Sequence, residues 1–205
     1  MSGTSLDAVD AAMILTDGER VTEFGPAIER KYTPAERSVL QAATEAARAW
    51  NWEGPIPEGP FKAALDVITE THADAWFRLT REERAPQPLL AGIHGQTVLH
   101  RRARGGAKGA TLQLVDPFAL RAALGVPLVC DFRSADVEAG GQGAPLAPAY
   151  HAALLNRLGD EPACVLNLGG VANITARLAD GSLIAFDTGP ANGPIDEWVE
   201  GNGAG

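Results

Sequence analysis

Residues 165–175 have the sequence Val-Leu-Asn-Leu-Gly-Gly-Val-Ala-Asn-Ile-Thr, an apolar run, a Gly-Gly pair and a second apolar run. This pattern predicts two strands joined by a tight turn, whose bare backbone suits close contact with a phosphate. Gly-Gly hairpins are also common in proteins that bind no phosphate. The stretch therefore predicts strand structure here, and its surroundings decide the fold class.

Short apolar segments separated by glycine-containing turns continue on both sides of this hairpin. We expect strands at residues 89–94, 111–115, 127–130, 164–168 and 183–186, and helices at 117–124 and 148–158. Strands that alternate with helices indicate an α/β domain with a largely buried sheet. Ligands of open α/β sheets bind at the strand ends, where the glycine-rich segments of this chain fall.

The N-terminal part of the chain carries hairpin and helix signals. Asp17-Gly18 lies between two apolar runs, 9–15 and 21–32, and predicts a hairpin. Thr33-Pro34-Ala35-Glu36 forms a capping box and predicts that a helix begins there. A second helix has one apolar face that includes His72, which we expect to be a hydrogen-bonded core histidine rather than a ligand; the face consists of Phe61, Leu65, Ile68, His72, Ala75 and Leu79.

Composition excludes several classes of protein. The 17 basic and 26 acidic side chains give a net charge of −9, which argues against a general nucleic-acid binder. The basic cluster Arg101, Arg102, Arg104 and Lys108 is expected to be a solvated loop. Cys130 and Cys164 lie in apolar runs, so we expect buried, reduced thiols and a cytoplasmic protein. No segment approaches the ~20 apolar residues of a membrane span, and from the N-terminal residues we expect no secretion signal.

The N-terminal segment is a candidate for phosphate and metal binding. Ser2-Gly3-Thr4-Ser5-Leu6-Asp7 precedes a strand, and its small residues let backbone N–H groups approach a phosphate. Asp7 or Asp10 could hold Mg²⁺ through water, because hard cations prefer oxygen ligands. The segment lacks the P-loop pattern, and an ordinary Ser/Gly turn is the alternative interpretation.

Two further segments suit recognition of a polar ligand. His94-Gly95-Gln96-Thr97 ends an apolar strand and suits a hydroxyl-rich ligand, the alternative being a turn with capping side chains. His94 and His100 have no third ligand at a useful spacing, which excludes a zinc site. Arg133 precedes a glycine run that leads into a helix near Pro148, so it could contact a carboxylate or phosphate, the alternative being a structural Arg–Asp pair.

Asp187 is the candidate general base. It follows an apolar strand and precedes a Gly-Pro turn, and a carboxylate there can take a proton from water if its surroundings tune its pKa. The alternative is an Asx-turn, in which Asp187 bonds only the local backbone.

The order of these segments is more specific than any of them alone. SGTSLD (2–7), HGQT (94–97), DFR (131–133) with GGQGAPLAPAYH (140–151), NLGGVANIT (167–175) and FDTGP (186–190) together closely resemble the anhydro-N-acetylmuramic acid kinase family. The resemblance extends from residue 2 to about residue 199. That family belongs to the acetate and sugar kinase/Hsc70/actin superfamily. The resemblance therefore implies a ribonuclease H-like, actin-like ATPase lobe, a mixed sheet with flanking helices.

The resemblance also implies an activity. The family uses ATP and Mg²⁺ to hydrolyse the anhydro bridge of 1,6-anhydro-N-acetylmuramic acid and to phosphorylate O6, which gives N-acetylmuramic acid 6-phosphate in peptidoglycan recycling. The partners implied are the amino sugar and ATP, without nucleic acid or membrane, and a homodimer stays open. A non-catalytic nucleotide- or phosphate-binding domain of the same fold is the alternative.

Residue roles follow by matching positions. The resemblance assigns Asp187 as catalytic base and Asp7 as metal ligand. It assigns the sugar side to His94, Gln96, Thr97 and Arg133. It assigns the ATP phosphates to Gly3, Thr4, Ser5, Leu6, Asp7, Ala8, Val9, Asp10, Asn167, Gly169 and Gly170.

The chain departs from the family pattern in two ways. Ala8 and Ala191 stand where the family usually has glycine, and alanine costs about 1 kcal/mol at any position that needs a positive φ. The strand before SGTS and the second lobe are also expected to be absent. Residues 1–205 are thus predicted to be the N-terminal lobe of a two-lobed sugar kinase, truncated at both ends and with little kinase activity alone.

Overall fold

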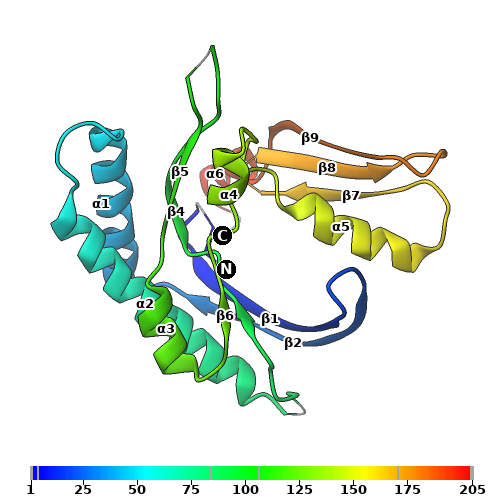
Figure 1. The fold of residues 1–205 in the computed structure, drawn as a ribbon, viewed down its shortest axis with the longest axis horizontal. Coiled ribbons are helices and arrows are strands. Elements are labelled where there is room, and N and C mark those ends of the chain that lie inside the picture. Colours follow the sequence, from blue (N-terminus) through cyan, green and yellow to red (C-terminus); the bar gives the residue numbers. More distant parts are fainter. Residues whose placement is uncertain (1, 4, 84, 106, 170, 204–205) are drawn as a thin grey trace. The chain divides into compact units, whose positions relative to one another are not determined.

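The computed structural model describes residues 2–3, 5–83, 85–105, 107–169 and 171–203 as a mixture of helices and small sheets (Figure 1). The chain divides into two compact units. The first consists of residues 1–14 and 24–144, and the second of residues 15–23 and 145–205. The predicted α/β class is confirmed at this level.

The predicted N-terminal hairpin is confirmed. Strands β1 (Ala8–Thr16) and β2 (Val21–Lys31) form a two-stranded sheet. The Asp17 carboxylate accepts hydrogen bonds from the backbone N–H groups of Glu19 and Arg20, which fixes the turn.

Two long helices supply the core of the first unit. Helix α1 (Pro34–Trp50) begins with the predicted capping box, in which Thr33 and Glu36 bond each other's backbone N–H groups. Helix α2 (Glu58–Thr80) packs against α1, and α3 (Pro117–Leu124) lies beside α2 (Figure 1). The buried side chains that share this core come from both helices, from the strands and from the loops beside them: Leu6, Val9, Tyr32, Leu40, Ala43, Ala47, Phe61, Ala64, Ile68, Ala75, Val98 and Leu114.

His72 lies in this core, as predicted, but only one of its ring nitrogens is bonded. Its Nδ1 donates to the carbonyl oxygen of Ile68 at 2.8 Å, while Nε2 is buried without a hydrogen-bond partner among the described residues. Burial lowers the pKa of His72 from 6.5 to about 4. The ring is therefore neutral in the folded protein at neutral pH.

The remaining strands of the first unit form two separate two-stranded sheets, and some of these strands are shorter than expected. The expected strand 89–94 reduces to β3 (Ala91–Gly92), which pairs in parallel with β6 (Leu128–Val129). A separate antiparallel pair consists of β4 (Gln96–Arg101) and β5 (Ala110–Leu114). The sequence did not predict β4 or the short helix α4 (Ser134–Glu138). The loop of basic residues after β4 is solvated, as predicted, and the Arg101 guanidinium lies 5.0 Å from the Trp52 ring centroid.

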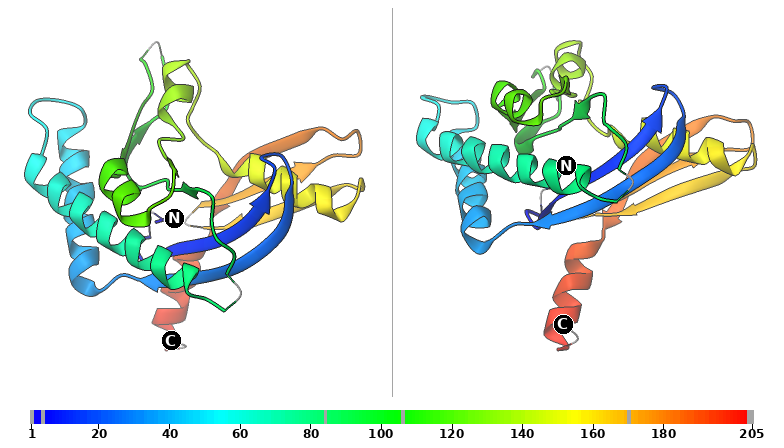
Figure 2. Two further views of the ribbon diagram at one scale, coloured as in Figure 1. Left: turned by 60° about the horizontal axis from the view of Figure 1, so that its bottom comes forward. Right: turned by 90° about the horizontal axis from the view of Figure 1, so that it is seen from below.

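The second unit is a three-stranded antiparallel sheet with helix α5 (Ala147–Leu155) along one face (Figure 2). The strands are β7 (Ala163–Leu168), β8 (Val171–Arg177) and β9 (Leu183–Pro190), in the order β7-β8-β9. The 3₁₀ turn η1 (Asn156–Leu158) follows α5, and helix α6 (Asn192–Gly201) follows β9. The His151 ring nitrogen Nδ1 and the Thr175 hydroxyl, both buried, lie 2.8 Å apart and join α5 to the central strand.

Two predictions about burial are wrong. The strands do not form one largely buried sheet, because those of the described residues fall into four small sheets and β9 is largely exposed. Both cysteines are free, as predicted, but Cys164 is exposed and Cys130 only half-buried. An apolar run identifies a strand, but it does not reveal whether another layer covers it.

No helix among the described residues is both long and apolar enough to cross a membrane.

Candidate functional site

The N-terminal loop is a tight turn held against the hairpin. Ser2 bridges Val9 in antiparallel fashion, and the Leu6 N–H donates to the Gly3 carbonyl at 3.3 Å. Leu6 is buried and has φ of +56°, a conformation that a branched side chain rarely adopts. The Tyr32 N–H, donating to the Asp7 carbonyl at 2.8 Å, ties the end of the loop to the residue after β2.

Asp7 has a cationic neighbour on α1. Arg37 Nη2 lies 3.6 Å from the Asp7 carboxylate and donates to the Ser5 carbonyl at 3.4 Å. Both charged side chains are at least half exposed, so the ion pair contributes little to stability. The Asp7 carboxylate is thus accessible to a competing cation.

The other residues assigned to this loop differ in accessibility. Ala8 and Val9 are buried in β1, whereas Asp10 is exposed. Thr4 lies outside the described residues. Neither Ala8 nor Ala191 has a positive φ, so alanine is compatible with the backbone at both positions. The left-handed conformation occurs at Leu6 instead.

His94 and Arg133 bond each other. Arg133 Nε donates to His94 Nε2 at 2.8 Å, and His94 Nδ1 donates to the Gly95 carbonyl at 2.9 Å. His94 is consequently the neutral tautomer with its proton on Nδ1. Burial lowers the pKa of His94, and the neighbouring Arg133 charge lowers it further. The observed hydrogen-bond partners of Arg133 are His94 and Gly143, not the aspartate of the alternative Arg–Asp pair.

The glycine run after Arg133 is folded back onto it. Arg133 Nη1 donates to the Gly143 carbonyl at 2.5 Å, and the Gly143 N–H donates to the Asp136 carboxylate at 2.7 Å. Gly143 has φ of +65°, and a Cβ there would lie 2.6 Å from Val137 Cγ2. Only glycine fits this position. Because two of its donors are used internally, the guanidinium is held in one orientation.

Gln96 and Thr97 differ in accessibility although they are adjacent. Gln96 is buried, with its side chain bonded to Ser2 and to the Thr97 carbonyl. Thr97 is half-buried, and its hydroxyl accepts from Gln113 Nε2 at 3.3 Å. Of these two residues, both assigned to the sugar, only Thr97 is therefore partly accessible to solvent.

In the second unit, three polar residues lie in register across the sheet. Asn167 pairs with Asn173, and Asn173 pairs with Asp187. Asn167 and Asp187 are exposed. A bulge at Thr188 interrupts the β8–β9 ladder beside Asp187, and bulges commonly re-aim a neighbouring side chain. The Asp187 carboxylate is therefore placed on the sheet, not in the turn that an Asx-turn would require.

The turn between β7 and β8 is tied to the start of α6. The Asn192 N–H donates to the Gly169 carbonyl at 3.0 Å. Gly170, the second glycine of the pair, lies outside the described residues. The hairpin predicted at residues 165–175 is confirmed, with Leu168 paired to Ala172 at its end.

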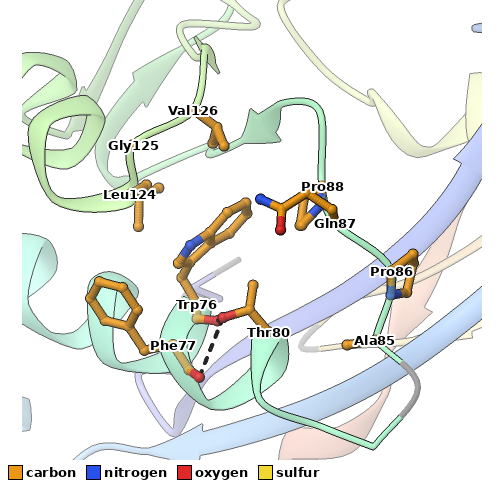
Figure 3. Close-up of a pocket in the computed structure, with 10 residues that line it drawn as sticks. All are labelled: Trp76, Phe77, Thr80, Ala85, Pro86, Gln87, Pro88, Leu124, Gly125 and Val126. Carbon is orange, nitrogen blue, oxygen red and sulfur yellow. Dashed lines mark hydrogen bonds between the residues drawn. The ribbon is translucent and has the colours of Figure 1, made fainter.

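Two surface hollows lie elsewhere in the first unit. One has a volume of about 290 Å³ between the C-terminal ends of α2 and α3 and is lined by Trp76, Phe77, Leu124 and neighbouring residues (Figure 3). The other, of about 800 Å³, is lined by residues 103–105, 107–109 and 137–140. None of the residues assigned to nucleotide, sugar, metal or catalysis lines either hollow. The described residues also contain no group of three His, Cys, Asp or Glu side chains that could hold a metal.

Sequence reasoning missed several residues that contact the assigned ones: Ser2, Tyr32, Arg37 and Asn173. Ser2 and Asn173 lie inside quoted motifs and could have been found there. Tyr32 and Arg37 carry no local signal, because their contacts bridge about thirty residues.

Comparison with known proteins gives one consistent answer. The family model described as anhydro-N-acetylmuramic acid kinase matches residues 1–204. Proteins named anhydro-N-acetylmuramic acid kinase are 51% identical over the whole chain in Phenylobacterium zucineum, 46% identical over the whole chain in Rhizobium rhizogenes, and 48% identical over 98% of the chain in Cereibacter sphaeroides. The matches cover 56%, 56% and 51% of those relatives, so the chain spans about half their length. The family predicted from the order of the motifs is thereby confirmed, and this chain belongs to the anhydro-N-acetylmuramic acid kinase family.

Proposed function

We propose that this chain, in its full-length protein, acts in an ATP-dependent kinase that opens the anhydro bridge of 1,6-anhydro-N-acetylmuramic acid and phosphorylates O6. Family membership supports the proposal. The observation that carries it is the exposed Asp187 carboxylate, in register with Asn173 and Asn167 on the strands that flank the Gly-Gly turn. A base must be accessible to the proton that it removes.

The phosphates of ATP are assigned to the two glycine-bearing turns. In the first unit, backbone N–H groups of the Gly3–Asp7 loop face the phosphates; in the second unit, the turn at Gly169 does so. Mg²⁺ is commonly held by one or two carboxylates together with substrate phosphates, and the exposed Asp7 carboxylate fits that role. When bound, the metal neutralises phosphate charge during transfer.

The sugar is assigned to His94, Thr97 and Arg133. Arg133 is oriented by His94 and Gly143, so its remaining N–H groups are available to an anionic or hydroxyl-bearing ligand. Matching to the family would place Gln96 with them, but its side chain is buried and bonded to Ser2.

The chemistry needs one proton transfer and one phosphoryl transfer. Asp187 takes a proton from the water that attacks the anomeric carbon, and the bond between that carbon and the bridging oxygen breaks. The freed oxygen on carbon six then attacks the γ-phosphorus of ATP, the bond between that phosphorus and the β–γ bridging oxygen breaks, and ADP leaves. Phosphoryl transfer depends mainly on positioning and charge neutralisation, which fits backbone-rich turns.

The proposal extends to the setting of the protein. It places the chain as the N-terminal, actin-like lobe of a two-lobed enzyme of peptidoglycan recycling in the cytoplasm, with little activity by itself. A homodimer stays open. The second candidate is a domain that binds nucleotide without turnover, which the backbone-rich loop at Gly3–Asp7 would also allow.

The test is an assay of the full-length protein with ATP and the anhydro sugar. We expect N-acetylmuramic acid 6-phosphate and ADP in equal amounts, and a roughly 10²–10⁴-fold loss of kcat in Asp187→Asn. Asp180→Asn is the matched control, because the Asp180 carboxylate accepts hydrogen bonds from Ser182 in the exposed β8–β9 turn, and this variant should keep full activity. Nucleotide binding without product would favour the second candidate. An active Asp187→Asn variant would remove Asp187 from the mechanism.

A further inference from the structure

A chain of buried hydrogen bonds lies behind the N-terminal loop. The Tyr32 hydroxyl donates to Ser2 Oγ at 2.9 Å, and the Ser2 hydroxyl donates to the Gln96 side-chain oxygen. The Gln96 amide nitrogen donates to the Thr97 carbonyl at 3.3 Å. Ser2, Tyr32 and Gln96 are 5%, 9% and 1% exposed. The contacts join segments separated by 30 and 94 residues, so they depend on the folded state.

Gln96 is poorly placed to contact a sugar. At 1% exposure its side chain is cut off from solvent, and both ends of its amide have protein partners. Removing a partner from such a group leaves a buried polar atom unsatisfied, which is costly. The half-buried Thr97, next in the chain, is accessible where Gln96 is not. An effect of Gln96 on a reaction must therefore pass through the residues that it bonds.

Ser2 directly precedes the Gly3–Asp7 loop that we assign to the ATP phosphates. It bridges Val9, and the loop between them contains the buried Leu6 at positive φ. A strained backbone conformation persists only where the surrounding contacts enforce it. The hydrogen bond between Ser2 and Gln96 is one such contact, and it fixes the start of the loop. Arg37 contacts the other end of the loop, at Ser5 and Asp7.

We infer that Gln96 is a positioning residue: through Ser2 it holds the Gly3–Asp7 loop in place, with Tyr32 as the second support of the same serine. The inference deepens the proposed function and rests on it for the role of the loop. It links β4, whose Thr97 is assigned to the sugar, to the loop assigned to ATP. It also explains why a glutamine within the HGQT motif is buried.

The first test measures hydrogen exchange of the backbone amides of residues 3–9 in Gln96→Met and Tyr32→Phe. We expect exchange in this loop to accelerate by roughly tenfold in Gln96→Met, which loses the buried hydrogen bond from Ser2 to Gln96. Tyr32→Phe loses the hydrogen bond from Tyr32 to Ser2 and should accelerate exchange by less. Gln113→Met is the matched control on β5, where the glutamine bonds Thr97 and Thr111 but not Ser2. Unchanged loop exchange in both variants would overturn the inference. If Gln96→Met accelerates exchange throughout α1 as well, that variant is globally destabilised. The loop exchange of Tyr32→Phe then decides whether the contacts of Ser2 hold the loop in place.

The second test measures kinetics in the full-length protein. We expect Gln96→Met and Tyr32→Phe each to raise the KM for ATP several-fold, roughly as the loss of one buried hydrogen bond predicts, and to leave the KM for the sugar within about twofold. Their effects should be less than additive in the double variant, because both act on Ser2. A Gln96→Met variant that raises only the KM for the sugar, with Tyr32→Phe unchanged, would make Gln96 a sugar ligand and overturn the inference. If the unmodified protein makes no product, the proposed function fails, whereas the exchange measurement still decides the role of Gln96.

Discussion

The core around α1 and α2 and the sheet of β7, β8 and β9 are both rich in apolar side chains, but only the core is covered on all sides. Five core side chains are fully buried: Leu40, Ala43, Ala47, Ala64 and Ile68. In the sheet, Leu166 pairs with Ile174, which pairs with Phe186, so the three side chains share one face. Leu166 is 55% exposed and Phe186 52%.

The difference lies in the number of layers. Helix α5 covers the face of the sheet that carries Thr175, as the bond from His151 shows. The described residues of the second unit place no helix on the face that carries Leu166. A sheet stabilises a domain by burying its apolar face against another layer. The first unit should therefore be much more sensitive to the loss of apolar side chains than the second.

The largest expected effect is in the helical core. Leu40→Ala should lower the free energy of unfolding by about 3 kcal/mol, because it removes a fully buried side chain and leaves a cavity. Urea denaturation followed by far-ultraviolet circular dichroism measures the loss. The same substitution at Leu89, which is 85% exposed in the same unit, should stay within about 0.5 kcal/mol. Similar losses at the two positions would contradict the contrast between them.

A smaller effect depends on pH. The pKa of His72 is lowered by burial from 6.5 to about 4, so between these values the unfolded chain binds a proton that the folded protein does not. Stability consequently falls as the pH falls from 6.5 towards 4, by about 2 kcal/mol at pH 5. His72→Leu should remove this part of the pH dependence. The difference between the two unfolding curves isolates His72 from His94 and His100, and parallel curves would show that His72 titrates normally.

In the second unit, the bond between α5 and the sheet is the sensitive point. Thr175→Val keeps the shape of the side chain and leaves the buried His151 nitrogen without its partner, so about 1 kcal/mol should be lost locally. Hydrogen exchange of the β8 amides reports this loss directly. In a His151→Leu background the substitution should have almost no further effect, since the partner is already gone. An equal loss in both backgrounds would mean that Thr175 stabilises the unit by another route.

Sequence patterns predicted those features of the fold that depend on neighbouring residues. The Asp17-Gly18 hairpin, the Thr33–Glu36 capping box and the strands around Gly169 are each specified within a few positions. The order of the motifs added the family, which no single segment could identify. Strand β4 was missed because His100 and Arg101 interrupt the apolar pattern on which strand prediction depends.

Features that depend on distant residues were not predictable in this way. The partner of Arg133 is His94, 39 residues away, and Gln96 bonds Ser2, 94 residues away. Both pairs consist of residues that the motifs had singled out, but nothing in the chain says that they contact each other. The roles assigned to Asp187, Asn167 and the N-terminal loop likewise stay predictions, because they rest on matching positions to a family.

The smallest expected effect tests the uncovered face itself. Leu166→Thr replaces an exposed apolar side chain with one that suits strands, and it should change the free energy of unfolding by less than about 0.5 kcal/mol. Val165→Thr is the matched substitution on the opposite face, since Val165 is half-buried and pairs with Thr175. It should cost about 1 kcal/mol, because it brings a hydroxyl towards α5 without a ready partner. Urea denaturation of each variant, compared with the unmodified protein, measures both changes in the free energy of unfolding. If Leu166→Thr costs as much as Val165→Thr, the Leu166 face is covered in solution, and the contrast between the closed core and the open sheet does not hold for the protein as it exists there.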